Sequence, residues 1–373
     1  MRIGFDATAI PENRVGAGNY SFNLVQALAN IDNKNEFFIF AQPIHIREWG
    51  IEEPNFHFIK VEMGSRLQRL LWEQSGLPWQ ARQLKLDVLH SPHYTMPLVK
   101  PCKSIVTFHD MTFQLFPEIH RPVHKVFFPL MMQWSAQKAD KLIAVSKSTK
   151  EDMLRLLKIS PERIVPIPEA ASSHYQQLPT EQVEKVCERY QLKRGKYIYY
   201  VGALEPRKNL PVLIEAYARI APDFPDIPLV IAGRKGWMYD EIFKKVTFLK
   251  LEEKVRFLGY VPENDLIGLY NGTQAFVYPS RYEGFGLPVL EAMQCGAPVI
   301  TTRISSMPEV AGEAALLVEP DDVEALSTAL REILTKDSVA RELSQRGLAR
   351  AKNFSWERCA QETLSVYESL FSE

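Results

Sequence analysis

Two glutamates, Glu283 and Glu291, bracket a glycine-containing loop in the second half of the chain. The apolar residues 274–278 before the loop are typical of a short buried strand, and Pro288 suits the first turn of a helix. The loop would therefore present backbone N–H groups at a helix N-terminus, which favours binding of an anion such as a phosphate. Gly286 and Leu287 are expected to offer these N–H groups, and Gly284 and Gly286 permit the backbone geometry of the loop.

The two glutamates need a neutral ligand, because a carboxylate placed against a phosphate would repel it. Ionised carboxylates only accept hydrogen bonds, and the neighbouring hydroxyls of a sugar are good paired donors. A phosphate site between two hydroxyl-binding glutamates is what a nucleotide sugar would require. The alternative is that Glu283 closes the loop and Glu291 is solvated on an exposed helix face, and the pair alone does not decide between these interpretations.

Two cations follow another predicted strand, residues 197–201. Gly202 marks a turn, and Arg207 and Lys208 stand where we expect a helix to begin, over residues 208–220. A guanidinium and an ammonium beside exposed N–H groups would neutralise a diphosphate and stabilise the charge left on it when a bond breaks. Two solvated surface cations are the alternative, which the position after a strand disfavours.

Two further loops follow predicted strands of the second half. Arg234 would approach the phosphates or the base of a nucleotide, and Gly233 before it permits close passage, although a simple glycine turn also fits. Tyr260 and Val261 lie in a loop suited to holding a base through backbone groups and an aromatic or aliphatic face.

In the first half, Gly16 and Gly18 separate a predicted strand from a helical pattern. The spacing matches the dinucleotide fingerprint only loosely, because the third glycine is missing. We expect a loop that gates the active site, with a plain tight turn as the alternative.

His109 and Asp110 directly follow the predicted strand 104–108, and Ser146 follows the predicted strand 141–145. Ligands of parallel sheets bind at the carboxyl ends of strands, so we expect these residues to be functional. An imidazole can donate and accept, and Asp110 could orient it or bind separately. The alternative is a histidine whose hydrogen bonds are satisfied at a strand end.

Strand-like and helical patterns alternate along both halves of the chain, which predicts an α/β fold with parallel sheets covered on both faces. Because 373 residues are too many for one compact core, we expect two doubly wound Rossmann-like domains. The first would end after residues 164–168, where prolines interrupt regular structure. The predicted strands are residues 3–6, 37–40, 56–61, 88–90, 104–108 and 141–145, then 197–201, 228–232, 255–258, 274–278, 298–301 and 315–318.

The composition excludes several classes of protein. A net charge of -1 gives no global basic field for nucleic acid. The four cysteines lie far apart, without the spacing of a zinc site or a redox dithiol, and read as free thiols in a reducing cytosol. The amino terminus enters a strand-like run without a signal peptide, and no stretch reaches the ~20 apolar residues of a membrane span.

Two basic segments rich in tryptophan and other apolar residues, 65–86 and 121–134, allow two interpretations. They could lie on an anionic membrane surface. They could equally be core helices with a solvated basic edge, which is the interpretation we favour.

The order of these features resembles the retaining glycosyltransferases of family 4, which have the GT-B fold. The resemblance spans essentially the whole chain, and its most specific part is the pair Glu283 and Glu291 with Arg207 and Lys208 upstream. It implies transfer of a sugar from a nucleoside diphosphate sugar to an acceptor hydroxyl, with retention at the anomeric carbon. Arg207 and Lys208 would hold the diphosphate, Glu291 the ribose, and Glu283 the donor sugar. Backbone contacts would come from Phe285, Gly286 and Leu287.

The resemblance also implies that His109 stabilises an oxocarbenium ion through its imidazole or its backbone carbonyl. Asp110 and Ser146 would lie on the acceptor side, and no divalent metal or other cofactor would be needed. Residues 1–168 would form the acceptor-side domain and residues 169–355 the donor-binding domain. The final helix, residues 356–373, would cross back to the first domain.

Within the family, the second half looks most like bacterial mannosyltransferases that build surface polysaccharides from GDP-mannose. We therefore expect a cytoplasmic enzyme that uses GDP-mannose and a glycan or lipid-linked saccharide acceptor, with peripheral contact at the inner membrane face as an open option. The alternatives are a UDP-sugar donor, a non-hydrolysing nucleotide-sugar epimerase, and a non-catalytic binding scaffold. A dehydrogenase is disfavoured by the incomplete glycine fingerprint, and the oligomeric state is not predicted.

Overall fold

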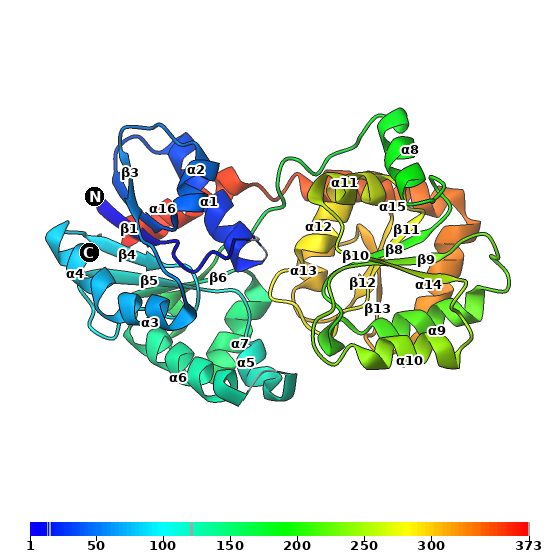
Figure 1. Cartoon of the computed structure of the whole chain (residues 1–373), viewed down its shortest axis with the longest axis horizontal. Helices are drawn as coiled ribbons and strands as arrows, with labels where there is room; N and C mark the ends of the chain where they lie inside the picture. Colours follow the sequence, from blue (N-terminus) through cyan, green and yellow to red (C-terminus); the bar gives the residue numbers. More distant parts are fainter. Residues whose placement is uncertain (13, 15, 120–121, 372–373) are drawn as a thin grey trace. The chain divides into compact units, whose positions relative to one another are not determined.

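The chain divides into two compact units in the computed structural model, which describes residues 1–12, 14, 16–119 and 122–371. The first unit comprises Met1–Glu169 together with Ser355–Glu373, and the second comprises Ala170–Phe354. Figure 1 labels the helices and strands of both units.

The described part of the first unit holds a parallel sheet of seven strands in the order β3-β2-β1-β4-β5-β6-β7. The order reverses between β1 and β4, so the switch point at which such sheets bind ligands lies at the carboxyl ends of these two strands. The strands are β1 (Arg2–Asp6), β2 (Glu36–Ala41), β3 (Phe56–Lys60), β4 (Val88–Ser91), β5 (Lys103–Phe108), β6 (Lys141–Ala144) and β7 (Ile164–Pro166).

Helices cover both faces of this sheet, with α1, α2 and α16 along one face and α3, α4 and α6 along the other (Figure 1). This layering explains why the strands are almost continuously apolar, since both faces of each central strand are buried. The helices are α1 (Ala17–Ile31), α2 (Pro43–Trp49), α3 (Arg66–Gln74), α4 (Gly76–Gln83), α5 (Thr112–Leu115), η1 (Pro117–Ile119), α6 (Pro122–Lys138), α7 (Lys147–Leu157), η2 (Pro161–Arg163) and α16 (Trp356–Ser369).

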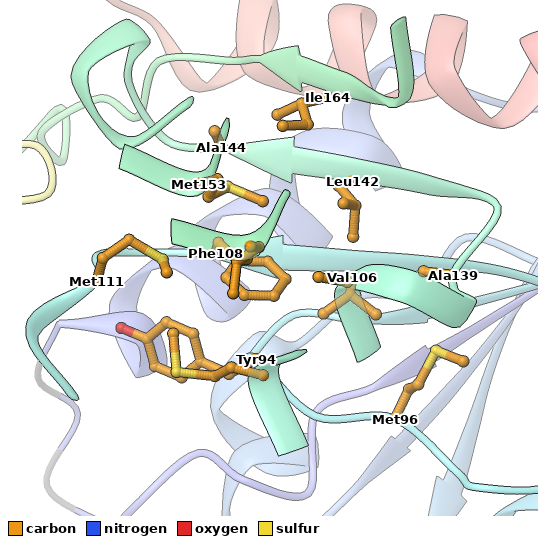
Figure 2. Close-up of a cluster of buried hydrophobic side chains, with 13 residues drawn as sticks. Tyr94, Met96, Val106, Phe108, Met111, Ala139, Leu142, Ala144, Met153 and Ile164 are labelled. Atoms are coloured by element: carbon orange, nitrogen blue, oxygen red, sulfur yellow. The ribbon is translucent and has the colours of Figure 1, made fainter. Parts of the chain in front are cut away.

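A buried apolar cluster fixes the carboxyl end of β5 (Figure 2). Phe108, the last residue of β5, lies edge-to-face with Tyr94, with ring centroids 5.9 Å apart. Met132 of α6 and Met153 of α7 pack into the same cluster. Because Phe108 directly precedes His109, this packing holds the histidine at the end of its strand.

The final helix, α16, packs on α1 within the first unit. His90 of β4 bonds Tyr367 of α16 through Nδ1 at 2.7 Å and Thr107 of β5 through Nε2 at 2.8 Å. Burial, with a smaller effect of nearby His109, lowers the pKa of His90 to about 3. A neutral, fully bonded histidine therefore ties the end of the chain to the first sheet.

The second unit has, within the residues described, a parallel sheet of six strands in the order β10-β9-β8-β11-β12-β13. Here the order reverses between β8 and β11, which places the second switch point at their carboxyl ends. The strands are β8 (Ile198–Val201), β9 (Leu229–Ala232), β10 (Val255–Gly259), β11 (Ala275–Tyr278), β12 (Val299–Thr302) and β13 (Ala315–Val318).

The helices of the second unit again form two layers, with α9, α10 and α14 on one face and α8, α11, α12 and α15 on the other (Figure 1). They are α8 (Thr180–Arg189), η3 (Pro206–Lys208), α9 (Leu210–Ile220), α10 (Asp240–Phe248), α11 (Glu263–Gly272), α12 (Leu287–Gln294), α13 (Met307–Ala311), α14 (Val323–Thr335) and α15 (Asp337–Ala351).

Each predicted strand is present, and each of its ends lies within one residue of the prediction. Residues 164–168 do not interrupt regular structure as predicted, because Ile164–Pro166 forms β7, but the first segment of the first unit does end next to them, at Glu169. β7 pairs with β6 at the edge of the sheet, where a proline that cannot donate is tolerated.

The two basic segments differ from each other. In the first, Leu77 of α4 is buried in a core cluster, as the core interpretation predicts. Leu67 and Leu71 of α3 and Trp79 of α4 are all more than 60% exposed, so that interpretation fits only part of the segment. In the second, Met132 is buried in the core, while Arg121 lies outside the described residues. No helix in the described part of the chain has the length and apolar character needed to cross a membrane.

Candidate active site

Two loops meet at the switch point of the second sheet. One follows β8 and contains the 3-10 turn η3, and the other follows β11 and leads into α12. The prediction of a helix beginning at Lys208 was wrong, because Asn209 adopts a left-handed conformation with φ 56° and α9 begins only at Leu210. Arg207 and Lys208 therefore lie on a tight turn before the helix.

The two cations surround Glu283. Its Oε2 lies 2.7 Å from Arg207 Nη1, and its Oε1 lies 2.6 Å from Lys208 Nζ. Ser280 Oγ donates to Oε1 at 2.6 Å, and Arg207 Nη2 also pairs with Glu205 Oε1 at 2.8 Å. We call Glu205, Arg207, Lys208 and Glu283 the ion cluster; its formal charges sum to zero.

Burial strengthens the electrostatic interactions between the charges of the ion cluster. Burial by itself raises the pKa of Glu283, but the charges of Arg207 and Lys208 outweigh it and hold the pKa at about 2. Burial and the Arg207 charge lower the pKa of Lys208, against the opposing effect of Glu283. Lys208 is 8% exposed, and its Nζ also donates to the Tyr278 hydroxyl at 2.5 Å. The second unit thus maintains a buried ammonium, a partly buried guanidinium and an ionised carboxylate at its switch point.

The loop after Glu283 is held by its backbone. Ser306 Oγ donates to the carbonyl oxygens of Glu283 at 2.9 Å and of Phe285 at 2.7 Å. Gly286 caps α12 at φ 103°, and a Cβ on this residue would lie 2.1 Å from Met307 Cε. Only glycine fits there, and the N-terminus of α12 follows as predicted, beginning at Leu287.

Gly202 and Gly233 pack against each other beside the ion cluster. A Cβ on Gly233 would lie 1.8 Å from the carbonyl oxygen of Gly202, so the close approach of the two backbones requires glycine. Arg234, next in the chain, lies over the ring of Tyr260 with 4.4 Å between its Cζ and the ring centroid. The exposed Tyr260 is followed by the buried Val261.

Glu291 belongs to a separate environment on α12. Its Oε2 accepts a hydrogen bond from Tyr270 of α11 at 2.9 Å. Burial raises the pKa of Glu291 to about 7, with a contribution from Glu263 and against the effect of the Tyr270 hydrogen bond. The two glutamates of the motif are therefore unlike: one stays ionised, and the other titrates near neutral pH.

In the first unit, the partner of His109 is Glu169 rather than Asp110. Nδ1 of His109 lies 3.1 Å from Glu169 Oε1, and Nε2 donates to the carbonyl oxygen of Pro92 at 2.8 Å. Asp110 instead accepts from the backbone N–H of Thr112 at 3.0 Å and from its hydroxyl at 2.7 Å, at the start of α5. Both ring nitrogens of the histidine are engaged within the unit.

Three other predicted residues have local structural roles. Ser146 caps α7 by accepting from the backbone N–H of Thr149 at 2.9 Å. Gly16 caps α1 at φ 49°, whereas Gly18 lies inside the helix. Of the two glycines predicted to form a loop, only Gly16 therefore lies outside the helix. A Cβ on Gly18 would lie 3.1 Å from Pro11 Cδ, which favours glycine for packing.

Three residues that were not predicted from the sequence complete these arrangements. Glu205 shares Arg207, Tyr270 bonds Glu291, and Glu169 bonds His109. Glu205 stands two residues before Arg207, which is a signal that could have been used. Glu169 is separated by 60 residues from its partner and carries no motif of its own. Among the residues described, no group of three or more His, Cys, Asp or Glu side chains could hold a metal ion.

The two-unit architecture is that of known glycosyltransferases of the GT-B fold. Sucrose-phosphate synthase from Thermosynechococcus elongatus superposes with a TM-score of 0.78 at 21% identity, covering 100% of this chain and 99% of that one. The Anabaena protein HepE, solved in complex with UDP-glucose, superposes with a TM-score of 0.78 at 16% identity, covering 99% and 100%. These likenesses show the fold alone.

Sequence relatives give the family. The profile described as Glycosyltransferase Family 4 matches residues 15–171, and the profile Glycosyl transferases group 1 matches residues 185–350. O-antigen chain mannosyltransferase B of Escherichia coli is 34% identical, over 99% of this chain and 100% of that protein. O-antigen chain mannosyltransferase RfbU of Salmonella typhimurium is 28% identical over 72% of each. The chain belongs to glycosyltransferase family 4 and is a glycosyltransferase.

Proposed function

We propose that the enzyme is a retaining mannosyltransferase that moves mannose from GDP-mannose to a hydroxyl of a glycan or lipid-linked saccharide acceptor. The observation that carries the proposal is the ion cluster at the switch point of the second sheet, where the partly buried Arg207 and the buried Lys208 lie beside the N-terminus of α12. Mannosyl transfer is supported by the names of the two O-antigen relatives.

In this proposal the diphosphate replaces Glu283 as the main partner of the two cations. A buried cation needs a negative partner, and a diphosphate can supply one without leaving Lys208 uncompensated. Glu283, still bonded to Ser280, then has carboxylate oxygens for the hydroxyls of the donor sugar. The cations stabilise the charge that develops on the diphosphate as the glycosidic bond breaks.

The remaining parts of the donor have candidate sites in the same unit. The N-terminus of α12, from Gly284 to Leu287, would take phosphate oxygens, with Gly202 and Gly233 allowing close approach. Glu291 would bind the ribose, and the loop with Tyr260 and Val261 would hold the base beside Arg234. We therefore assign the donor to the domain of residues 169–355.

We assign the acceptor to the domain of residues 1–168, with Asp110 and Ser146 on that side. Of the two groups that His109 offers to an oxocarbenium ion, we favour its backbone carbonyl, because both ring nitrogens already face acceptors within the first unit. Gly16 and Gly18 would shape the start of α1 at the active site.

A donor screen tests the proposal. GDP- and UDP-sugars are incubated with lipid-linked saccharide acceptors, with and without EDTA, and nucleotide release is measured. We expect acceptor-dependent release from GDP-mannose, unchanged by EDTA because two cations and a helix N-terminus supply the positive charge that a metal would. Nucleotide release from UDP-sugars but not from GDP-sugars would make a UDP-sugar the donor instead of GDP-mannose. An epimerised sugar nucleotide formed without acceptor would contradict transfer, and activity lost with EDTA and restored by Mg²⁺ would contradict the metal-free site.

The donor affinity should depend on pH through Glu291. Its pKa of about 7 leaves roughly a tenth of the carboxyl ionised at pH 6 and nine tenths at pH 8. Because the ribose hydroxyls need the carboxylate as acceptor, the Kd for GDP-mannose should fall about tenfold as pH rises from 6 to 8. Calorimetry with GDP-mannose measures this, and the intact sugar nucleotide avoids the titration of a terminal phosphate. Glu291→Gln should bind weakly with a flat profile; the same slope in this variant would refute the assignment.

We further propose that the enzyme works in the cytoplasm, with α3 and α4 touching an anionic membrane. The exposed Leu67, Leu71 and Trp79 share these helices with Arg82, and Lys85 follows them, a mixture suited to a lipid surface. Flotation with anionic vesicles should recover the wild-type protein, and the double variant Leu67→Ser, Leu71→Ser should stay at the bottom. Equal recovery of both proteins, or of neither, would refute the contact.

A further inference from the structure

A second polar cluster occupies the switch point of the first sheet. The parallel register pairs Gly4 with Leu89 and Phe5 with His90, and its continuation sets Asp6 of β1 beside Ser91 of β4. Side chains alternate along strands, so Asp6 and Ser91 point to the same face as Leu89, which is the face covered by α3 and α4. These two residues end their strands where ligands of doubly wound sheets bind.

Helix α3 brings two further charges to this position. Arg69 Nη2 lies 2.5 Å from Glu73 Oε2 and 4.0 Å from Asp6 Oδ2. Thr95 donates its hydroxyl to Glu73 Oε2 at 3.0 Å, and Thr8 donates its backbone N–H and hydroxyl to Asp6 Oδ1. The carboxylates and the guanidinium are thereby fixed in place from three different segments of the chain.

Several polar atoms of this cluster have no partner. Ser91 is 2% exposed, and its Oγ and the Nε of Arg69 make no hydrogen bond within the described part of the chain. Asp6 Oδ2 has, among the described residues, only the Arg69 contact at 4.0 Å, which is beyond hydrogen-bond length. Buried polar groups are almost always paired, so unfilled donors and acceptors gathered at a switch point indicate a missing partner.

His93 adds a half-buried imidazole to the cluster. Its ring lies edge-to-face with that of Tyr94, with centroids 4.7 Å apart, and 6.2 Å from the ring of His109. The backbone at His93 itself contributes a hydrogen bond that raises the pKa of the ring, and no side chain of another described residue is hydrogen-bonded to it. Burial, followed by the charges of His109 and Arg69, lowers the pKa of His93 to about 3. At neutral pH the ring is uncharged and offers one donor and one acceptor.

The chemistry of these unfilled atoms selects the ligand. Asp6 and Glu73 place two carboxylates against the single guanidinium of Arg69, which disfavours binding of an anion. The described residues include no group of three or more His, Cys, Asp or Glu side chains that could hold a metal ion. The free donors are the Ser91 hydroxyl and Arg69 Nε, the free acceptor is Asp6 Oδ2, and the uncharged His93 ring lies beside them. A sugar hydroxyl both donates and accepts, so neighbouring hydroxyls of one sugar ring fit such a mixed set.

We propose that Asp6, Arg69, Ser91 and His93 form a subsite for the hydroxyls of the saccharide acceptor. The inference rests on the proposed transferase function and adds a binding site to it in the first unit. Of the acceptor-side residues expected from the sequence, Asp110 accepts from Thr112 and Ser146 caps α7, whereas this cluster has hydrogen-bonding capacity to spare.

The test uses the full-length protein with GDP present and a panel of methyl α-glycosides of mannose, glucose, galactose and N-acetylglucosamine. Saturation-transfer NMR measures glycoside binding, calorimetry measures GDP binding, and thermal unfolding reports stability. For Ser91→Ala and His93→Phe we expect about tenfold weaker glycoside binding, unchanged GDP affinity and, for Ser91→Ala, an unchanged or higher Tm because the lost hydroxyl had no partner.

Matched controls lie at the amino ends of strands of the same sheet, away from the cluster. Ser104 of β5 is equally buried, but its hydroxyl donates to Asp140, so Ser104→Ala should lower the Tm and leave glycoside binding unchanged. Asp87, just before β4, accepts from the backbone N–H of Arg2, and Asp87→Asn is the control for Asp6→Asn. These pairs separate binding from folding. The subsite variants should weaken glycoside binding, whereas a control that breaks a structural hydrogen bond should lower the Tm and leave glycoside binding unchanged.

Each outcome decides the proposal. Glycoside binding that is unchanged in Ser91→Ala, His93→Phe and Asp6→Asn would mean that the cluster holds only water and would overturn it. Weaker GDP or GDP-mannose binding with normal glycoside binding would assign the hydroxyls to the donor sugar instead. A wild-type protein that binds no glycoside of the panel would also contradict the subsite. Because binding is measured without turnover, an incorrect donor assignment would not affect these results.

Discussion

Lys208→Met is expected to lower kcat/KM for sugar transfer by about 10²- to 10³-fold, the usual effect of removing a group that stabilises transition-state charge. The ammonium of Lys208 lies 2.6 Å from Glu283 and is almost fully buried, so no solvent cation can replace it. Steady-state nucleotide release at saturating acceptor measures the change. A variant that retains more than half of the wild-type kcat/KM would remove Lys208 from the diphosphate site.

The same variant should also be less stable, because breaking a buried ion pair leaves a charge without its partner, at a cost of about 3 kcal/mol. Arg207 remains beside Glu283 and limits this loss. Activity must therefore be normalised to the folded fraction, measured by circular dichroism. Lys245→Met is the control: Lys245 pairs with Glu215 on the partly exposed surface of the same unit, and its loss should change neither activity nor stability by much.

Glu283→Gln is expected to abolish most of the transfer and to change the acid stability of the protein. The pKa of Glu283 falls from 4.5 to about 2 on folding, so its ionised form contributes on the order of 3 kcal/mol above pH 4.5. That contribution is lost as pH falls from 4.5 towards 2. Urea unfolding should show the wild type more stable than the variant at pH 6, with the difference shrinking below pH 4.

The control for this prediction is Glu215→Gln, which removes a carboxylate from a partly exposed ion pair. It should leave the acid profile nearly unchanged, because exposed pairs contribute little. If Glu283→Gln instead followed the wild-type curve at every pH, the carboxylate would not be the charge that the two cations stabilise, and the ion cluster would need another explanation.

The sequence predicted the fold well because buried parallel strands are short apolar runs that stand out between helices. β7 was missed because Pro166 and the nearby Pro168 suggest a loop, and the place of β7 at the sheet edge is what makes Pro166 acceptable. The start of α9 was placed two residues too early because Asn209 tolerates the left-handed conformation but does not require it, so its residue type does not fix the helix start. Such local conformations depend on tertiary contacts that a single sequence does not display.

The candidate site was predicted in part. The motif brought Arg207, Lys208 and Glu283 to attention, and the structure brings them into direct contact. That Glu283 pairs with both cations did not follow from the sequence, where it was expected to face hydroxyls only. The different pKa values of Glu283 and Glu291 arise from burial and from charges distant in the sequence, which residue types alone cannot reveal.

The structure also changes how His109 is understood. Its position after β5 was predicted, but its partner Glu169 lies 60 residues away and was not. Both ring nitrogens are engaged, which moves the proposed electrostatic role from the imidazole to the backbone. A side chain held in this way is a rigid support for the backbone at the strand end.

The anomeric configuration of the product tests the central claim most directly. The protein is incubated with GDP-α-mannose and a lipid-linked saccharide acceptor, and the new linkage is examined by proton and carbon NMR through its one-bond C1–H1 coupling. A retaining mannosyltransferase predicts an α-linked mannose on the acceptor. A β-linked product, or GDP-mannose that is hydrolysed or epimerised with no mannose on any acceptor, would contradict it.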